Sequence, residues 1–180
     1  MSMLPVCPVF IVIEGPEGCA TAEFGRAFAR AFGRLMINCP WVRGPKQRAD
    51  MKRSCEGSPL AQLLLRVGAI AAICDVVRGE LAAGLPVVMD RYWLSATAAS
   101  DAMGWSRPLE DVAAQLPEAD ITFYLYPPQA PSLAVDYRER LRHPLVGTVI
   151  PVALNQSVEI LANHWIQVFA ASVPARWRNW

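Results

Sequence analysis

One short segment limits the folds open to this chain more than any other. The apolar run Val9–Ile13 leads directly into a turn with glycines at Gly15 and Gly18. A strand made only of apolar residues is buried on both faces, which is typical of the centre of a parallel sheet. From residue 22 to 32, Phe and Ala then recur at helical spacing. The order strand, glycine turn, helix therefore predicts an α/β domain with a candidate ligand-binding turn near its start.

The same alternation continues along the chain. Further strands are expected at 35–39, 85–90, 121–126 and 149–152, and further helices at 60–81, 96–102, 109–116 and 157–170. Strands that alternate with helices form parallel sheets with right-handed crossovers, and ligands bind beyond the carboxyl ends of the strands. We therefore expect a parallel sheet flanked by helices, in a single domain that spans residues 1–180.

Charge and hydropathy exclude several classes of protein. The chain has 180 residues, of which 53% are hydrophobic, and a formal net charge of +1. A charge so close to zero argues against a general nucleic-acid binder, although residues 43–53 are basic and form either a solvated connector or a phosphate-facing loop. No uninterrupted apolar run reaches the ~18 residues that a membrane span needs, and the start of the chain lacks the basic region of a secretory signal.

The cysteines indicate the redox setting of the chain. They are scattered, odd in number and never spaced as CxxC, at Cys7, Cys19, Cys39, Cys55 and Cys74. With only two histidines in the chain, a zinc site is disfavoured. We expect buried free thiols in a reducing, intracellular compartment, with the cytoplasm as the first expectation.

The turn at 15–22 occupies the place of a P-loop, which has the form GxxxxGK[ST]. In a P-loop, backbone N–H groups surround the phosphates, the lysine reaches the terminal phosphates and the hydroxyl holds magnesium. Here Ala20 replaces the second glycine, Thr21 the lysine and Ala22 the hydroxyl residue. The turn is therefore either a P-loop without its cation or an ordinary glycine turn at the end of a buried strand.

Two further charged groups are candidates for phosphate chemistry. Asp90 and Arg91 follow the expected third strand, where a carboxylate and a guanidinium can hold magnesium and a phosphate, or form a structural ion pair. Arg138, Arg140 and Arg142 can supply cations to a transferring phosphoryl group, or line an ordinary exposed helix.

Taken in chain order, these segments resemble the thymidylate kinase family of P-loop nucleoside monophosphate kinases. The resembling segments are FIVIEGPEGCATAEFGRAFARAFG at 10–33, GSPL at 57–60, VVRGELAAGLPVVMDRY at 76–92, LPEADITFYLYPP at 116–128 and NQSVEILANHW at 155–165. The DRY and TFYL segments are the most specific of these. The resemblance is collinear and covers most of the chain.

The resemblance implies a five-stranded parallel sheet flanked by helices and phosphoryl transfer from ATP to dTMP, or a related pyrimidine nucleotide, with Mg²⁺. Asp90 would hold the magnesium, Arg91 the acceptor phosphate, and Glu17 would lie near the acceptor sugar or the metal. The donor phosphates would lie against Gly15, Pro16, Gly18, Cys19, Ala20, Thr21 and Ala22.

The chain departs from the family pattern at three places. The phosphate loop lacks its lysine and hydroxyl, as described above. The base-stacking Phe and base-reading Arg of the family fall on Leu65 and Ala69. The basic lid is reduced to a vestige at about 129–148, with Arg138, Arg140 and Arg142 as its candidate cations.

Three functions follow as hypotheses. The first is a divergent kinase of dTMP or a related nucleotide, and the second is a catalytically inactive pseudokinase that serves as a structural or regulatory subunit. Nucleic-acid binding through residues 43–53 ranks below both. The partners expected are a nucleotide, if the site is intact, and a second copy of the chain or a larger protein assembly. The apolar helix at 60–81 is either a contact surface for such a partner or, equally, a helix buried against the sheet of its own chain.

Overall fold

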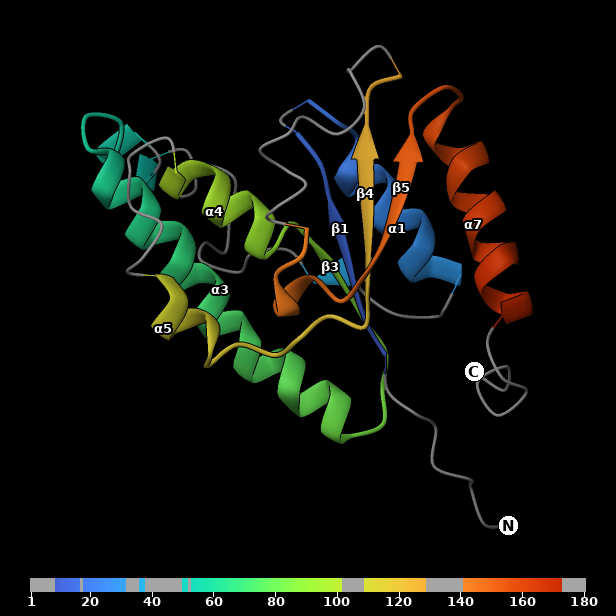
Figure 1. Cartoon of the computed structure of the whole chain (residues 1–180), viewed down its shortest axis with the longest axis horizontal. Helices are drawn as coiled ribbons and strands as arrows, with labels where there is room; N and C mark the ends of the chain where they lie inside the picture. Colours follow the sequence, from blue (N-terminus) through green and yellow to red (C-terminus); the bar gives the residue numbers. More distant parts are fainter. Residues whose placement is uncertain are drawn as a thin grey trace.

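The computed structural model describes residues 9–16, 18–31, 36–37, 50–51, 53–101, 109–128 and 141–172. Its strands and helices alternate along the chain (Figure 1). They are β1 (Phe10–Glu14), α1 (Thr21–Ala31), β2 (Met36–Ile37), α3 (Pro59–Ala82), β3 (Val87–Asp90), α4 (Trp93–Asp101), α5 (Glu110–Ala113), β4 (Ile121–Tyr126), the 3-10 helix η2 (Pro144–Val146), β5 (Thr148–Ala153) and α7 (Val158–Ser172). The fold is α/β, as predicted.

The strands form one five-stranded sheet in the order β2-β3-β1-β4-β5, and every pair of neighbours is parallel. β1 lies at the centre, which explains why every one of its residues is buried. In the register of the sheet, Ile13 lies opposite Asp90 and Glu14 opposite Tyr124. The turn after β1 and the end of β3 therefore meet at the same edge of the sheet.

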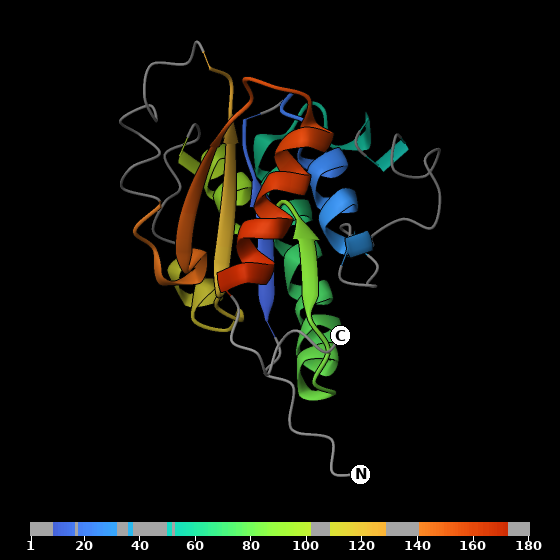
Figure 2. The same ribbon diagram turned by 90° about the vertical axis from the view of Figure 1, so that its right-hand side faces the viewer.

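Helices cover both faces of the sheet. α1 and α7 lie on one side, and α3, α4 and α5 lie on the other, as the two perpendicular views show (Figures 1 and 2). Residues of β1 alternate between the two cores, with Phe10 and Val12 facing α3 and α4, and Ile11 and Ile13 facing α1 and α7.

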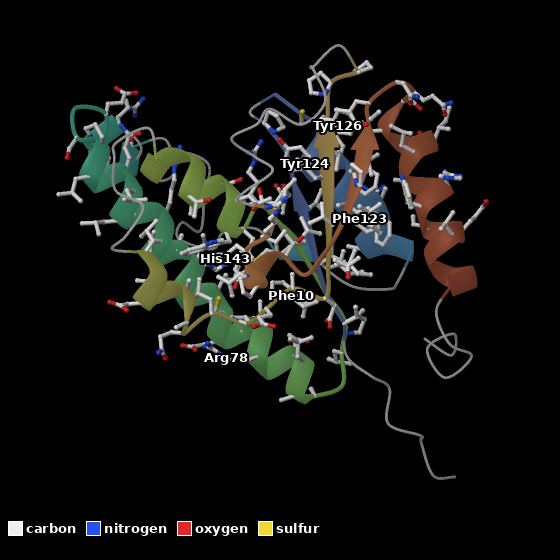
Figure 3. All side chains as sticks on the ribbon, viewed as in Figure 1. Phe10, Arg78, Phe123, Tyr124, Tyr126 and His143 are labelled. Carbon is white, nitrogen blue, oxygen red and sulfur yellow. The ribbon has the colours of Figure 1, made fainter. Side chains whose placement is uncertain are left out.

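An aromatic cluster fixes α1 and α7 on the sheet. The Phe123 ring lies 5.6 Å from that of Phe24, 4.9 Å from that of Phe28 and 5.8 Å from that of Trp165, measured between centroids. Figure 3 shows Phe123 on the α7 side of β4 and Tyr124 on the opposite side. This alternation places Tyr124 on the face that α4 and η2 cover, where it packs with Leu94.

The predicted elements are present within the described residues, with shifted ends. β4 spans the predicted 121–126, whereas α4 begins at Trp93, three residues before the predicted start. The early start has a cause distant in the sequence, because the Glu14 carboxylate accepts hydrogen bonds from the backbone N–H groups of Tyr92 and Ser95. α5 ends at Ala113 rather than at residue 116, and a turn follows it.

The helix α3 bears on the expectation that the chain has no membrane span, because by length and composition it could cross a bilayer. Arg66, Asp75 and Arg78 interrupt its apolar sequence, yet its 24 residues are long and apolar enough on average to cross a bilayer. In the structure, 39% of its most apolar window is buried. The core helix of a globular domain meets the same criterion, and α3 packs against the sheet through residues such as Leu63 and Ile73.

The start of β5 depends on one glycine. Gly147 has φ +60°, and a Cβ at this position would collide with the carbonyl oxygen of Ala119. Its N–H donates to Pro144 O at 3.1 Å, and the next residue, Thr148, donates to Asp120 O at 3.0 Å. The close approach of two backbone segments therefore requires glycine at position 147.

We predict that Gly147→Ala lowers the free energy of unfolding by about 2–4 kcal/mol, because the collision adds to an unfavourable backbone conformation. Gly79→Ala is the matched control, since a Cβ there meets nothing within 4 Å and Gly79 is exposed in α3. The control is expected to raise stability by up to about 1 kcal/mol. Urea denaturation measures both changes, and equal stability of the two variants would contradict the prediction.

Candidate functional site

The bend between β1 and α1 is compact and closed by its own backbone. Cys19 N–H donates to Pro16 O at 3.2 Å, and Thr21 N–H donates to Cys19 O at 2.7 Å. Gly18 has φ +87°, and a Cβ on Gly15 would lie 2.6 Å from the carbonyl oxygen of Leu125 in β4. Both glycines are therefore needed, one for its left-handed backbone and one for its closeness to the sheet.

The bend retains backbone donors that have no acceptor among the described residues. Within the described chain, the N–H groups of Gly18, Ala20 and Ala22 have no hydrogen-bond partner. They alternate with the bonded N–H groups of Cys19 and Thr21 and lead into the amino end of α1. Free N–H groups at a helix amino end attract anions, because they carry the partial positive charge of the helix dipole. The bend therefore has the donors of an anion site without a lysine.

Arg91 reaches this bend from the end of β3. Its Nη1 donates to Gly15 O at 3.1 Å and, more weakly, to Ser95 Oγ at 3.5 Å, and its Nη2 donates to Pro16 O at 3.2 Å. Arg91 is also the described non-glycine residue with positive φ, at +63°. The structure thus brings Arg91 and the predicted phosphate loop into direct contact.

Asp90 lies beside the first residue of α1. Its Oδ1 is buried without a hydrogen-bond partner within the described chain. Burial raises the pKa of the Asp90 carboxyl above its ordinary value, while the neighbouring Thr21 side chain and the charges of Arg91 and Arg26 act in the opposite direction. An orphaned buried oxygen at a site of this kind suits a cation or a donor brought by a ligand.

Glu14 is a site residue that the sequence analysis did not identify. It is 1% exposed, and its Oε1 accepts from Tyr92 N at 2.8 Å and from Ser95 N at 3.3 Å. Its Oε2 accepts from Ser95 Oγ at 2.6 Å. Burial raises the pKa of the Glu14 carboxyl, and the bonds from Ser95 and Tyr92 and the charge of Arg91 oppose this rise. The only sequence signal was a carboxylate placed directly after a fully apolar strand.

The remaining predicted site residues do not contact the bend of residues 15–22 or lie outside the described residues. Glu17, Arg138 and Arg140 are outside the described residues, and Arg142 is exposed. Ala69, at the place of the base-reading Arg of the family, is 2% exposed and is one of the buried residues of α3. The helix position that would face a base in the family therefore faces the protein interior here.

The residues present could hold Mg²⁺ only if phosphate oxygens of a ligand supplied further coordination. No cluster of three or more His, Cys, Asp or Glu residues exists among the described residues. Mg²⁺ is held by one or two carboxylates together with phosphates and water, so Asp90 with its free oxygen fits as a protein ligand. Ala22 has no hydroxyl to add a second ligand.

Comparison with solved structures identifies the fold. The chain superposes on thymidylate kinase from Candida albicans (TM-score 0.63, 14% identity, 91% of this chain and 92% of that chain) and on thymidylate kinase from Ehrlichia chaffeensis (0.63, 14%, 90% and 98%). A sugar kinase from a Janibacter species is also similar (0.54, 15%, 92% and 96%). No protein-family model and no curated protein matches the sequence. The chain therefore has a thymidylate-kinase-like P-loop kinase fold, as predicted.

We predict that the stability of the protein falls as pH rises above the ordinary Glu14 value of 4.5. The folded state binds the Glu14 proton more tightly than the unfolded state does, so ionisation favours unfolding. Glu14→Gln is expected to remove much of this fall, and the similarly shifted Asp90 contributes the rest. Denaturation at several pH values from about pH 4 to about pH 8 measures the effect.

Ser95→Ala is the matched control for this prediction. It removes a donor to the Glu14 carboxylate but leaves the titrating group in place. The fall in stability with pH is therefore expected to persist in Ser95→Ala and to extend to higher pH. An unchanged pH profile in Glu14→Gln would show that this carboxyl does not control the stability.

Proposed function

We propose that the chain binds a nucleoside phosphate at the bend of residues 15–22 and has largely lost phosphoryl transfer, as a pseudokinase. The observation that carries this proposal is the burial of Thr21. Thr21 stands where a P-loop kinase has its lysine, and its exposed fraction is only 2%. It can neither reach a terminal phosphate nor carry a positive charge.

Several groups at the site support the proposal that it binds a nucleotide. The N–H groups of Gly18, Ala20 and Ala22 provide donors for phosphate oxygens. Asp90 has one oxygen for a magnesium ion that arrives with ATP, and magnesium neutralises charge on the phosphates when it is bound.

The site lacks two of the groups that catalyse phosphoryl transfer in P-loop kinases. Phosphoryl transfer depends almost entirely on positioning and on charges placed around the transferring group. Removing one preorganised donor of this kind commonly costs ~10²–10³ in rate, and losses within one catalytic unit are not additive. The lysine and the hydroxyl are both absent at positions 21 and 22, so a rate close to background is expected.

A divergent kinase of dTMP or another pyrimidine nucleotide is the second candidate. It is favoured by Asp90, whose Oδ1 has no hydrogen-bond partner in the part of the chain that the structure describes, because a purely structural carboxylate normally has both oxygens satisfied. The two candidates share the nucleotide site and differ in turnover. The free thiols of Cys19, Cys55 and Cys74 support a reducing, intracellular setting for either one.

We further propose that the outer face of α3 binds a second copy of the chain. Leu60, Leu64 and Val76 are 38%, 59% and 50% exposed, and the charged side chains of Asp75 and Arg78 on this helix pair with each other at 3.1 Å. A helix that is apolar on all sides is normally covered on all sides. A symmetric pair of such helices would cover both faces at once.

The binding and transfer steps can be measured separately. We predict that calorimetry detects ATP binding in the presence of Mg²⁺, and that a coupled ADP-release assay with a panel of nucleoside monophosphates stays close to background.

Thr21→Lys with Ala22→Ser restores both missing groups and is expected to raise the rate of phosphoryl transfer by at least about 10²-fold. Turnover of the unmodified chain at roughly 1 s⁻¹ or faster would favour the second candidate. Absence of ATP binding would remove both.

The assembly is tested by the mass of the particle in solution. We predict that light scattering after size exclusion reports two copies, and that Leu64→Glu reports one copy with unchanged thermal unfolding. Ile160→Glu is the matched control, because Ile160 is an equally exposed apolar residue, at 56%, on α7. A monomer at all accessible concentrations would refute the proposal, and a larger mass would indicate a higher assembly.

A further inference from the structure

The geometry points to Arg91 as the cation that faces the donor phosphates, in place of the lysine that is absent at position 21. This inference rests on the proposed nucleotide binding at residues 15–22. It gives Arg91 a different partner from the acceptor phosphate that the family resemblance implies. The chain would thus keep a positive charge at its phosphate site by supplying it from β3 instead of from α1.

The contacts of Arg91 place its guanidinium against the first two residues of the bend. Nη2 donates to Pro16 O at 3.2 Å, and the same oxygen accepts from Cys19 N at 3.2 Å. That oxygen therefore points across the bend towards the residues that close it. Nη1 is fixed by Gly15 O at 3.1 Å, so the guanidinium plane spans the start of the bend. The positive charge also acts on the Cys19 thiol, whose pKa it lowers against the larger effect of burial.

Arg91 has donors left for a ligand. A guanidinium carries five N–H groups, and the contacts with Gly15, Pro16 and Ser95 use three of them. The Nε–H group and the second hydrogen of Nη2 have no acceptor within the described residues. Two donors in a planar arrangement match two oxygens of a phosphate. The free N–H groups of Gly18 and Ala20 lie in the same bend.

Other described arginines are engaged elsewhere or exposed. Arg26 of α1 forms an ion pair with Glu23 at 3.3 Å, and both side chains are about half exposed, at 48% and 59%. Arg142, from the reduced lid, is exposed. Among the described residues, Arg91 is the cation that contacts the bend directly.

The backbone on either side of Arg91 is fixed, which directs its side chain to the bend. Arg91 N–H donates to Ile13 O at 2.9 Å, and Tyr92 N–H donates to the Glu14 carboxylate at 2.8 Å. The Tyr92 hydroxyl donates to Pro117 O at 2.8 Å. These bonds hold Arg91 at φ +63°, a conformation that residues other than glycine rarely adopt. Burial of Tyr92 and Glu14 thus sets the position of the guanidinium.

The test compares donor and acceptor nucleotides in four variants. Arg91→Gly removes the guanidinium and suits a positive φ, so folding is preserved on the backbone side. Arg91→Gln keeps an amide donor near the Gly15 carbonyl but removes the charge. Calorimetry with ATP, ADP and dTMP is run on the full chain, with Arg30→Ala as the control, because Arg30 is exposed in the last turn of α1.

We predict that ATP and ADP binding weakens about tenfold to a hundredfold in Arg91→Gly and Arg91→Gln, while any dTMP binding and the Arg30→Ala control stay unchanged. Adding Thr21→Lys to Arg91→Gly is expected to restore ATP binding, because it returns the charge without returning the contacts to Gly15 and Pro16. Restoration therefore separates a charge that binds phosphate from an arginine that only braces the bend.

Three outcomes would overturn the inference. Unchanged ATP binding in Arg91→Gly and Arg91→Gln would leave the proposed nucleotide site standing without Arg91. Loss of dTMP binding alone would return Arg91 to the acceptor phosphate. Failure of the unmodified chain to bind ATP or ADP would instead remove the proposed function itself, and the inference with it. Thermal unfolding of each variant confirms that a loss of binding is not a loss of fold.

Discussion

The buried Glu14 carboxylate is the interaction on which the functional edge of this molecule depends. It ends the central strand and accepts three hydrogen bonds from Tyr92 and Ser95, at the beginning of α4. A carboxylate buried to this degree is stable only where its hydrogen bonds are satisfied, so the two segments must stay together. Through this one group, the bend after β1 and the end of β3 form a single unit, with Arg91 held between them.

The fold was predictable from the sequence because its strands lie in the interior of a parallel sheet. Central strands such as β1 and β4 appear as nearly continuous apolar runs, and a glycine turn follows β1 whereas two prolines, Pro127 and Pro128, follow β4. The edge strand β2 has only two residues, so its pattern gave little information about its length. The start of α4 was missed because Glu14, 78 positions before Tyr92 in the sequence, satisfies its first N–H groups.

The candidate site was predictable in its location but not in its contacts. Strand ends predicted that residues 15–22, Asp90 and Arg91 would share one edge of the sheet, and the register of β1 and β3 places them there. Which acceptor Arg91 meets depends on a positive φ that no sequence pattern indicated. The burial of Thr21 depends likewise on how α1 packs against the sheet, which the local sequence does not indicate.

The contact between Gly15 and the backbone of β4 affects how any anion would bind. The bend rests on the sheet at Leu125, closes on itself at Pro16 and is braced by a side chain from β3. Little conformational freedom remains to be lost when a ligand arrives, and that loss is one of the main terms opposing association. The site is therefore preformed, and we expect it to select among anions by their size and shape and not by a change in the conformation of the loop on binding.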